Sequence, residues 1–80
     1  MKKPSPEETQ RHNGERLRAL REAVGMTQTD LAARVGQTSD NIHLFEQGER
    51  RITASELWAI CAAMNKRPHE FFDGEVEAQS

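Results

Sequence analysis

The segment from Thr27 to Gly48 constrains the fold more than any other stretch, because it carries the start and stop signals of two short helices. The Thr27 hydroxyl can accept a hydrogen bond from a free backbone N–H, and Asp30 stands at the capping-box position. Gly36 has no Cβ and can adopt the left-handed conformation that ends one helix and turns the chain into the next. Gly48 ends the second helix. Residues 27–47 therefore predict a helix-turn-helix layout.

Helical spacing gives these two helices an inward and an outward face. The predicted inward residues are Leu31, Ala32, Val35, Ile42 and Phe45. The second helix is capped by Thr38 or Ser39, and its outward residues are Ser39, Asp40 and His43, with Leu44 and Gln47 at the edge. Small polar side chains at the exposed start of a helix are suited to contacting another molecule.

Three further helices are predicted around this segment, all without strand patterning. One runs from about Asn13 to Gly25, with an inward stripe of Leu17, Leu20 and Val24. Another begins after Thr53, with a core stripe of Ala54, Leu57, Ile60, Cys61 and Met64. A short fifth helix opens at Pro68 and carries Phe71 and Phe72. The chain is thus predicted to be all-α.

Charged and aromatic residues beside the core stripes need partners. Arg21 lies next to an apolar stripe, and Glu46 is the carboxylate placed to pair with it, unless both point into water. Trp58 is one position off its stripe, so it is either partly buried within the monomer or part of a contact between subunits. Phe71 and Phe72 point about 100° apart on a helix, so one of them needs a partner outside the core.

Composition predicts one domain, at 13–74, between two polar ends. Residues 1–12 have no apolar residue after Met1 and are predicted to be a flexible arm. Lys2 and Lys3 could reach DNA from it, but a solvated tail is the favoured interpretation. Residues 75–80 are predicted to be an acidic, disordered tail.

The same composition argues against several classes of protein. No apolar run approaches the roughly 18 residues of a membrane span, and no signal-peptide stretch follows Met1, so we expect a cytoplasmic protein without membrane contact. Cys61 is the sole cysteine and fits a buried position. His12, His43 and His69 lack metal-ligand spacing, and no catalytic arrangement occurs on one element. We expect no metal, no cofactor and no enzymatic activity.

Net charge is −2, which does not by itself favour binding to nucleic acid. The charge is uneven, however. Residues 1–34 carry seven basic and five acidic side chains, and residues 35–80 carry four basic and eight acidic ones. A locally basic face with an acidic far side remains compatible with DNA binding.

The chain resembles the lambda-repressor-like, XRE-type family of helix-turn-helix regulators. The matching residues stand in one register over about residues 13–74: Leu17, Leu20, Arg21, Thr27, Gln28, Leu31, Ala32, Gly36, Ile42, Glu46, Gly48, Arg51, Leu57, Met64, Phe71 and Phe72. The resemblance implies a compact five-helix bundle that binds double-stranded DNA operators as a symmetric homodimer. It also supports the Arg21–Glu46 ion pair.

Carried over by position, the resemblance implies a set of DNA-binding residues: Thr27, Gln28, Gln37, Thr38, Ser39, Asp40, Asn41, His43, Leu44, Arg50 and Arg51. Gln28 matches a residue that contacts phosphate and braces the recognition helix, and Arg50 and Arg51 match a loop along the backbone. Trp58, Phe71 and Phe72 are the candidate dimer interface.

Two positions depart from the family. Asp40 is acidic, so it must accept from a cytosine amino group, avoid the backbone or weaken binding. Leu44 could pack on a thymine methyl group or contact another protein.

The leading hypothesis is a sequence-specific transcriptional regulator on a palindromic operator. The alternative is a protein-interaction module of the same fold, antitoxin-like or an accessory partner, that does not read DNA.

Overall fold

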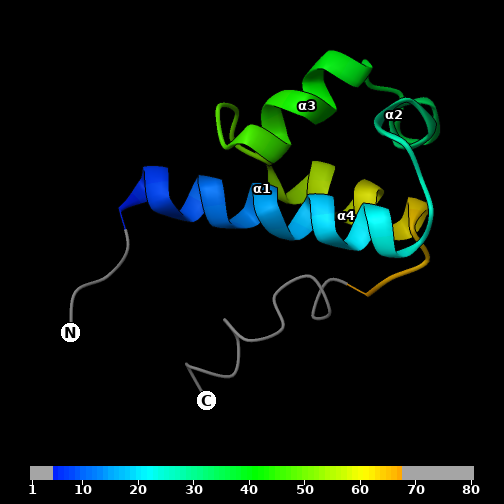
Figure 1. Cartoon of the computed structure of the whole chain (residues 1–80), viewed down its shortest axis with the longest axis horizontal. Helices are drawn as coiled ribbons and strands as arrows, with labels where there is room; N and C mark the ends of the chain where they lie inside the picture. Colours follow the sequence, from blue (N-terminus) through cyan, green and yellow to red (C-terminus); the bar gives the residue numbers. More distant parts are fainter. Residues whose placement is uncertain (1–4, 68–80) are drawn as a thin grey trace.

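The computed structural model describes residues 5–67, which form four α-helices. They are α1 (Pro6–Ala23), α2 (Gln28–Val35), α3 (Ser39–Gln47) and α4 (Ala54–Ala63). The helix α3 packs on α1 and on α2, and α2 packs on α4, with the long α1 running across the domain (Figure 1). The predicted all-α class is confirmed. The predicted fifth helix, with Phe71 and Phe72, and the tail at 75–80 lie outside the described residues.

Each helix begins at a hydroxyl cap. The side chains of Ser5, Thr27, Thr38 and Thr53 each accept a hydrogen bond from the backbone N–H three residues later. Helices α2 and α3 end at Gly36 and Gly48, whose φ angles of 69° and 75° are left-handed. These are the start and stop signals that the sequence placed around the helix-turn-helix, and glycine adopts such φ angles without a steric cost.

The first helix begins much earlier than its sequence pattern predicts. The Ser5 hydroxyl accepts from the Glu8 backbone N–H, and the Glu8 carboxylate accepts from the Ser5 N–H, both at 3.1 Å. Pro6 follows at the first helical position, where its missing N–H costs nothing. The arm predicted for residues 1–12 is therefore wrong from Pro6 onward. Those turns are exposed and lack apolar periodicity, so only the Ser5-x-x-Glu8 capping box signals them.

The core lies between the four helices. Its buried residues are Leu17, Leu31, Ala32, Ile42, Phe45, Ile60, Cys61 and Met64, each at most 3% exposed. Met26 and Ile52, from the connecting segments, pack against this cluster. Two predicted core positions are wrong. Val24 caps the end of α1 and is 37% exposed, because the helix stops at Ala23; Ala54 is exposed in the first turn of α4.

Gly14 allows α1 and α3 to approach closely. It is buried, and a Cβ there would lie 2.6 Å from the carbonyl oxygen of Glu46 and would also overlap that of Phe45. A side chain at this position would force the two helices apart. The site described below depends on this contact, since it sets the position of α3 on the rest of the domain.

Two absences hold for the part of the chain that the structure describes. None of its helices combines the length and apolar character needed to cross a membrane. No three histidine, cysteine or acidic side chains within residues 5–67 gather where they could hold a metal ion.

Candidate nucleic-acid interface

The outward face of α3 is an exposed polar surface. Asp40, His43 and Gln47 stand at i, i+3 and i+7 and are all exposed, while Leu44 beside them is half-buried. Ser39, at the start of the helix, is also half-buried. Helical geometry places these side chains along one side of α3, opposite the buried Ile42 and Phe45. We call Ser39, Asp40, His43, Leu44 and Gln47 the α3 outer face.

A buried ion pair joins α3 to α1. Arg21 donates from Nε to Glu46 Oε2 at 2.6 Å and from Nη2 to Glu46 Oε1 at 3.1 Å, and the two side chains are 10% and 1% exposed. Arg21 Nη1 also donates to the carbonyl oxygen of Met26 at 2.8 Å. The hydrogen bond with Glu46 raises the pKa of Arg21 above its ordinary value. The bidentate geometry fixes the rotation of α3 relative to α1.

Gln28 connects this pair to the surface. Its Nε2 donates to Glu46 Oε1 at 3.0 Å and lies 3.4 Å from His43 Nδ1. The first residue of α2 therefore contacts the middle of α3 on both its buried and its exposed sides. The family resemblance implies that Gln28 braces the recognition helix, and these two contacts join Gln28 to α3.

The turn between α2 and α3 is held by its own side chains. Thr38 Oγ1 accepts from the Asn41 backbone N–H at 3.1 Å, and Asn41 Nδ2 donates to Gln37 Oε1 at 2.9 Å. Gln37 and Asn41, both predicted to bind DNA, are thus bonded to each other. Thr38 is exposed beside them.

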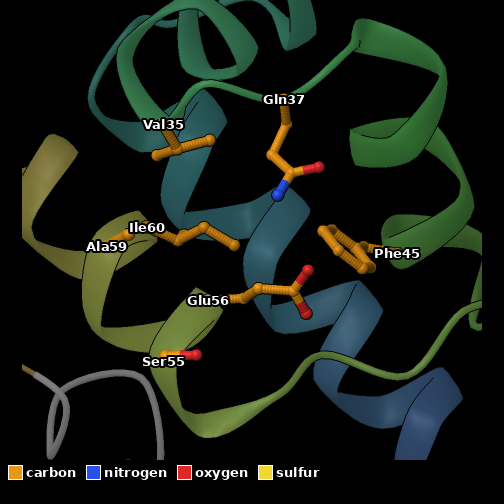
Figure 2. Close-up of a pocket in the computed structure, with 7 residues that line it drawn as sticks. All are labelled: Val35, Gln37, Phe45, Ser55, Glu56, Ala59 and Ile60. Carbon is orange, nitrogen blue, oxygen red and sulfur yellow. The ribbon is translucent and has the colours of Figure 1, made fainter.

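Behind this turn lies a small hollow between α2, α3 and α4, which Figure 2 shows. Its volume is about 130 Å³, and it is lined by Val35, Gln37, Phe45, Ser55, Glu56, Ala59 and Ile60. Gln37 extends into it from the turn and Glu56 from α4 (Figure 2). Pockets that enclose a small molecule are usually about 300–1,000 Å³. This hollow is smaller than that range.

The loop after α3 carries two exposed arginines. The Arg50 guanidinium carbon lies 5.6 Å from the centroid of the Phe45 ring, within the range of a cation–π contact. Arg51 lines a hollow together with the first turns of α1. Gln10 donates from Nε2 to the carbonyl oxygen of Gly48 at 3.3 Å. The early turns of α1, missed from the sequence, therefore support the arginine loop.

Thr27 is exposed and is the N-cap residue of α2. Its backbone N–H donates to Asp30 Oδ2 at 3.0 Å, and its hydroxyl accepts from the Asp30 N–H at 3.0 Å. Hydrogen bonds from the Thr27 backbone and then its side chain lower the pKa of Asp30. The start of α2 is thereby fixed next to the α3 outer face.

The predicted dimer residues lie apart from these contacts. Trp58 is 64% exposed on α4, so residues 5–67 do not bury it. Phe71 and Phe72 lie outside the described residues. The structure brings together Arg21, Glu46, Gln28 and His43 in one connected group, and it leaves Trp58 at the surface.

Two short helices joined by a glycine turn, the second with a polar outer face, define a helix-turn-helix domain. The family model for the helix-turn-helix domain matches residues 14–70. The chain belongs to this family.

Similar proteins include transcriptional regulators. An uncharacterized HTH-type transcriptional regulator of Sinorhizobium fredii, y4wC, is 34% identical over 68 residues, which are 85% of this chain and 48% of that protein. An uncharacterized transcriptional regulator in the ATPase CF(0) region of Rhodospirillum rubrum is 36% identical over 66 residues, 82% of this chain and 60% of that protein. The chain thus spans only about half to three-fifths of their length.

Solved structures share the same fold. The restriction-modification controller protein C.AhdI from Aeromonas hydrophila has a TM-score of 0.77 at 30% identity, over 80% of this chain and 97% of that one. The clp gene regulator ClgR from C. glutamicum has a TM-score of 0.80 at 18% identity, over 98% and 97% of the two chains, and shows the fold alone. The predicted kinship with XRE-type regulators is confirmed.

Proposed function

We propose that this chain is a sequence-specific DNA-binding transcriptional regulator that places the α3 outer face in the major groove. The observation that carries the proposal is that contacts from α1 and α2 fix the orientation of that face. The Arg21–Glu46 pair and the close contact at Gly14 hold α3 from α1, and Gln28 holds it from α2. An exposed helix with polar side chains and a fixed orientation is what readout of base edges requires.

Contacts to phosphate would come from the ends of the helix-turn-helix. The start of α2, at Thr27 and Gln28, presents the positive end of the helix dipole, and the Thr27 N–H itself donates to Asp30. Arg50 and Arg51 supply exposed positive charge after α3. Gln37, Thr38 and Asn41 would hold the turn against the groove edge. These contacts would offset the low overall basicity, because the acidic residues other than Asp40 need not face the DNA.

We further propose a homodimer on a palindromic operator. Recognition helices must lie about 34 Å apart to enter successive major grooves, and a two-fold interface is the simplest way to set that spacing. Trp58 is the exposed aromatic side chain of α4 and suits such an interface, with Phe71 and Phe72 as the proposed continuation. The domain would then comprise residues 13–74 and the earlier turns of α1.

The test is selection of bound sequences from a random duplex pool, repeated at two salt concentrations. We expect a palindromic motif and affinity that falls steeply with salt. Replacing both Arg50 and Arg51 by Gln should flatten the salt slope by about one for each phosphate that is no longer neutralised. The matched control is Arg18→Gln, which removes an exposed positive charge that pairs with Glu22 on α1. No enrichment by folded protein would instead favour the protein-interaction module, with Leu44 and Trp58 as its first candidates.

A further inference from the structure

A hydrogen-bonded chain leads from the buried core to the α3 outer face. It runs from Arg21 through Glu46 and Gln28 to His43. The first two members are buried, Gln28 is half-buried and His43 is exposed. Because each link restricts the donor and acceptor roles of the next, the core can determine which hydrogen-bonding atom His43 presents outward.

At Glu46, the donor and acceptor roles in this series of hydrogen bonds are fixed. An arginine guanidinium only donates, so both Glu46 oxygens accept from Arg21, at 2.6 Å and 3.1 Å. Gln28 lies 3.0 Å from Glu46 Oε1. The amide group nearest that oxygen must therefore be the NH₂ of Gln28, since its carbonyl oxygen would face another acceptor. The orientation of the Gln28 amide follows from these roles.

The orientation of Gln28 then sets the role of His43. An amide NH₂ has two hydrogens. One of them is used by Glu46, and the same nitrogen lies 3.4 Å from His43 Nδ1. Nδ1 must accept this second hydrogen, so a neutral His43 carries its own proton on Nε2. The two ring nitrogens flank Cε1 and their N–H directions diverge widely, so the Nε2–H points away from Gln28.

We propose that Gln28 holds His43 in the Nε2–H tautomer and that His43 thereby reads a guanine edge in the major groove. Guanine offers two acceptors there, N7 and O6, whereas adenine offers N7 beside an amino donor and thymine offers O4 beside a methyl group. Cytosine offers only an amino donor, with which an N–H cannot pair. Asp40, one turn earlier on the same face, only accepts and suits that cytosine amino group. A fixed donor and a fixed acceptor one turn apart match the two edges of G·C pairs. This inference rests on the proposed DNA-binding function.

The tautomer can be measured without DNA. In the full chain labelled with ¹⁵N, the imidazole nitrogens of His43 should show an unprotonated Nδ1 and a protonated Nε2 at neutral pH. Gln28→Met removes the donor at similar volume, and it should move the tautomer ratio toward that of an unstructured histidine peptide. A protonated Nδ1 in the unmodified protein, or a ratio that Gln28→Met leaves unchanged, overturns the tautomer assignment.

The base preference is measured on duplexes from the selection experiment, at the position where His43→Ala abolishes discrimination. We expect about tenfold preference for guanine over cytosine there, because cytosine has no acceptor for the Nε2–H. His43→Gln should transfer the preference to adenine, because Gln pairs with adenine N6 and N7. Enrichment of a motif with no guanine preference at any His43-dependent position overturns the inference alone. Failure to enrich any duplex, with the tautomer as stated, overturns the DNA reading together with the proposed function.

Discussion

Arg21 Nε lies 2.6 Å from Glu46 Oε2, and this contact joins the first helix to the helix proposed to enter DNA. The carboxylate also accepts from Gln28, so one buried group connects three helices. A buried pair of this kind contributes little net stability over apolar side chains, but it specifies one arrangement of the helices when all its hydrogen bonds are satisfied. The pair is therefore placed to orient the recognition surface.

Glu46→Ala should lower the free energy of unfolding by about 3–5 kcal/mol, because it leaves the Arg21 charge buried without a partner. Urea unfolding followed by circular dichroism measures the change. The double variant Arg21→Met with Glu46→Leu removes both charges at similar volume and should recover most of the stability. A melting temperature unchanged in Glu46→Ala would contradict the burial of the pair.

Gly14→Ala should destabilise the domain by about 1–3 kcal/mol, although alanine is the better helix former. The added methyl group would overlap the carbonyl oxygens of Phe45 and Glu46, so α3 must move away from α1. Thermal unfolding gives the size of the effect. The control, Ala19→Gly at an exposed position of α1, should cost only the propensity difference of about 1 kcal/mol. Equal stability of Gly14→Ala and the unmodified protein would mean that the two helices are not in close contact.

The helix-turn-helix could be predicted from sequence because its signals are local. Thr27, Gly36 and Gly48 each carry a cap or stop whose physics depends on a few neighbouring residues. The start of α1 was not predicted because its turns are exposed and lack apolar spacing, although Ser5 and Glu8 form a capping box.

Contacts between distant segments could not be predicted in the same way. The approach at Gly14 and the bond from Gln10 to Gly48 depend on how α1 crosses α3, which no periodicity reports. The contact of Gln28 with His43 likewise joins residues on different helices. Arg21 and Glu46 were paired from sequence because a charge beside an apolar stripe needs a partner, and the family resemblance supported the pair.

Lowering the pH should unfold the first turn of α1. Hydrogen bonds from the Ser5 backbone and then its side chain lower the pKa of Glu8 below its ordinary value of 4.5. Since the folded-state pKa is depressed, the stabilisation is present above pH 4.5 and is lost as pH falls through the lower, folded value. Helix content followed by circular dichroism from about pH 6 to about pH 2 should show the loss. Asp30 adds a similar loss at the start of α2.

The matched variants for this titration lie in the same turn. Glu8→Gln keeps a side chain that can accept from Ser5 without titrating, so it should reduce the acid-dependent change. Glu7→Gln removes a neighbouring exposed carboxylate that is not part of the box and should leave more of the change in place. If both variants follow the unmodified protein, the Ser5–Glu8 cap is not the source of the transition.

Asp40→Asn should raise affinity for duplexes without a cytosine at the Asp40 position and shift base preference there from cytosine toward adenine. The acidic side chain repels phosphate and only accepts hydrogen bonds, whereas asparagine is neutral and pairs with adenine N6 and N7. Binding to the selected duplex and its single-base variants measures both effects. Glu15→Gln, an equal charge change on an exposed position of α1, is the control. Equal gains in affinity from both variants, with no change in base preference, would show that Asp40 does not contact the bases.

Trp58→Glu should weaken self-association at least about tenfold while leaving the fold intact. Residues 5–67 leave Trp58 64% exposed, so its replacement removes little from the core. A charge at the centre of the proposed interface would be strongly unfavourable. Sedimentation velocity over a range of concentrations gives the association constant. Ala19→Glu, at an exposed position of α1, controls for the added charge.

If Trp58→Glu becomes monomeric, binding to a two-half-site operator should fall far more than binding to one half-site, because the dimer supplies the second contact. Unmodified protein that stays monomeric at all concentrations, or a dimer insensitive to the change, would place the interface elsewhere. The spacing between the two half-sites tests whether α4 forms the interface. A dimer held through α4 fixes one separation of the two α3 helices, so inserting a few base pairs between half-sites should abolish the gain from dimerisation.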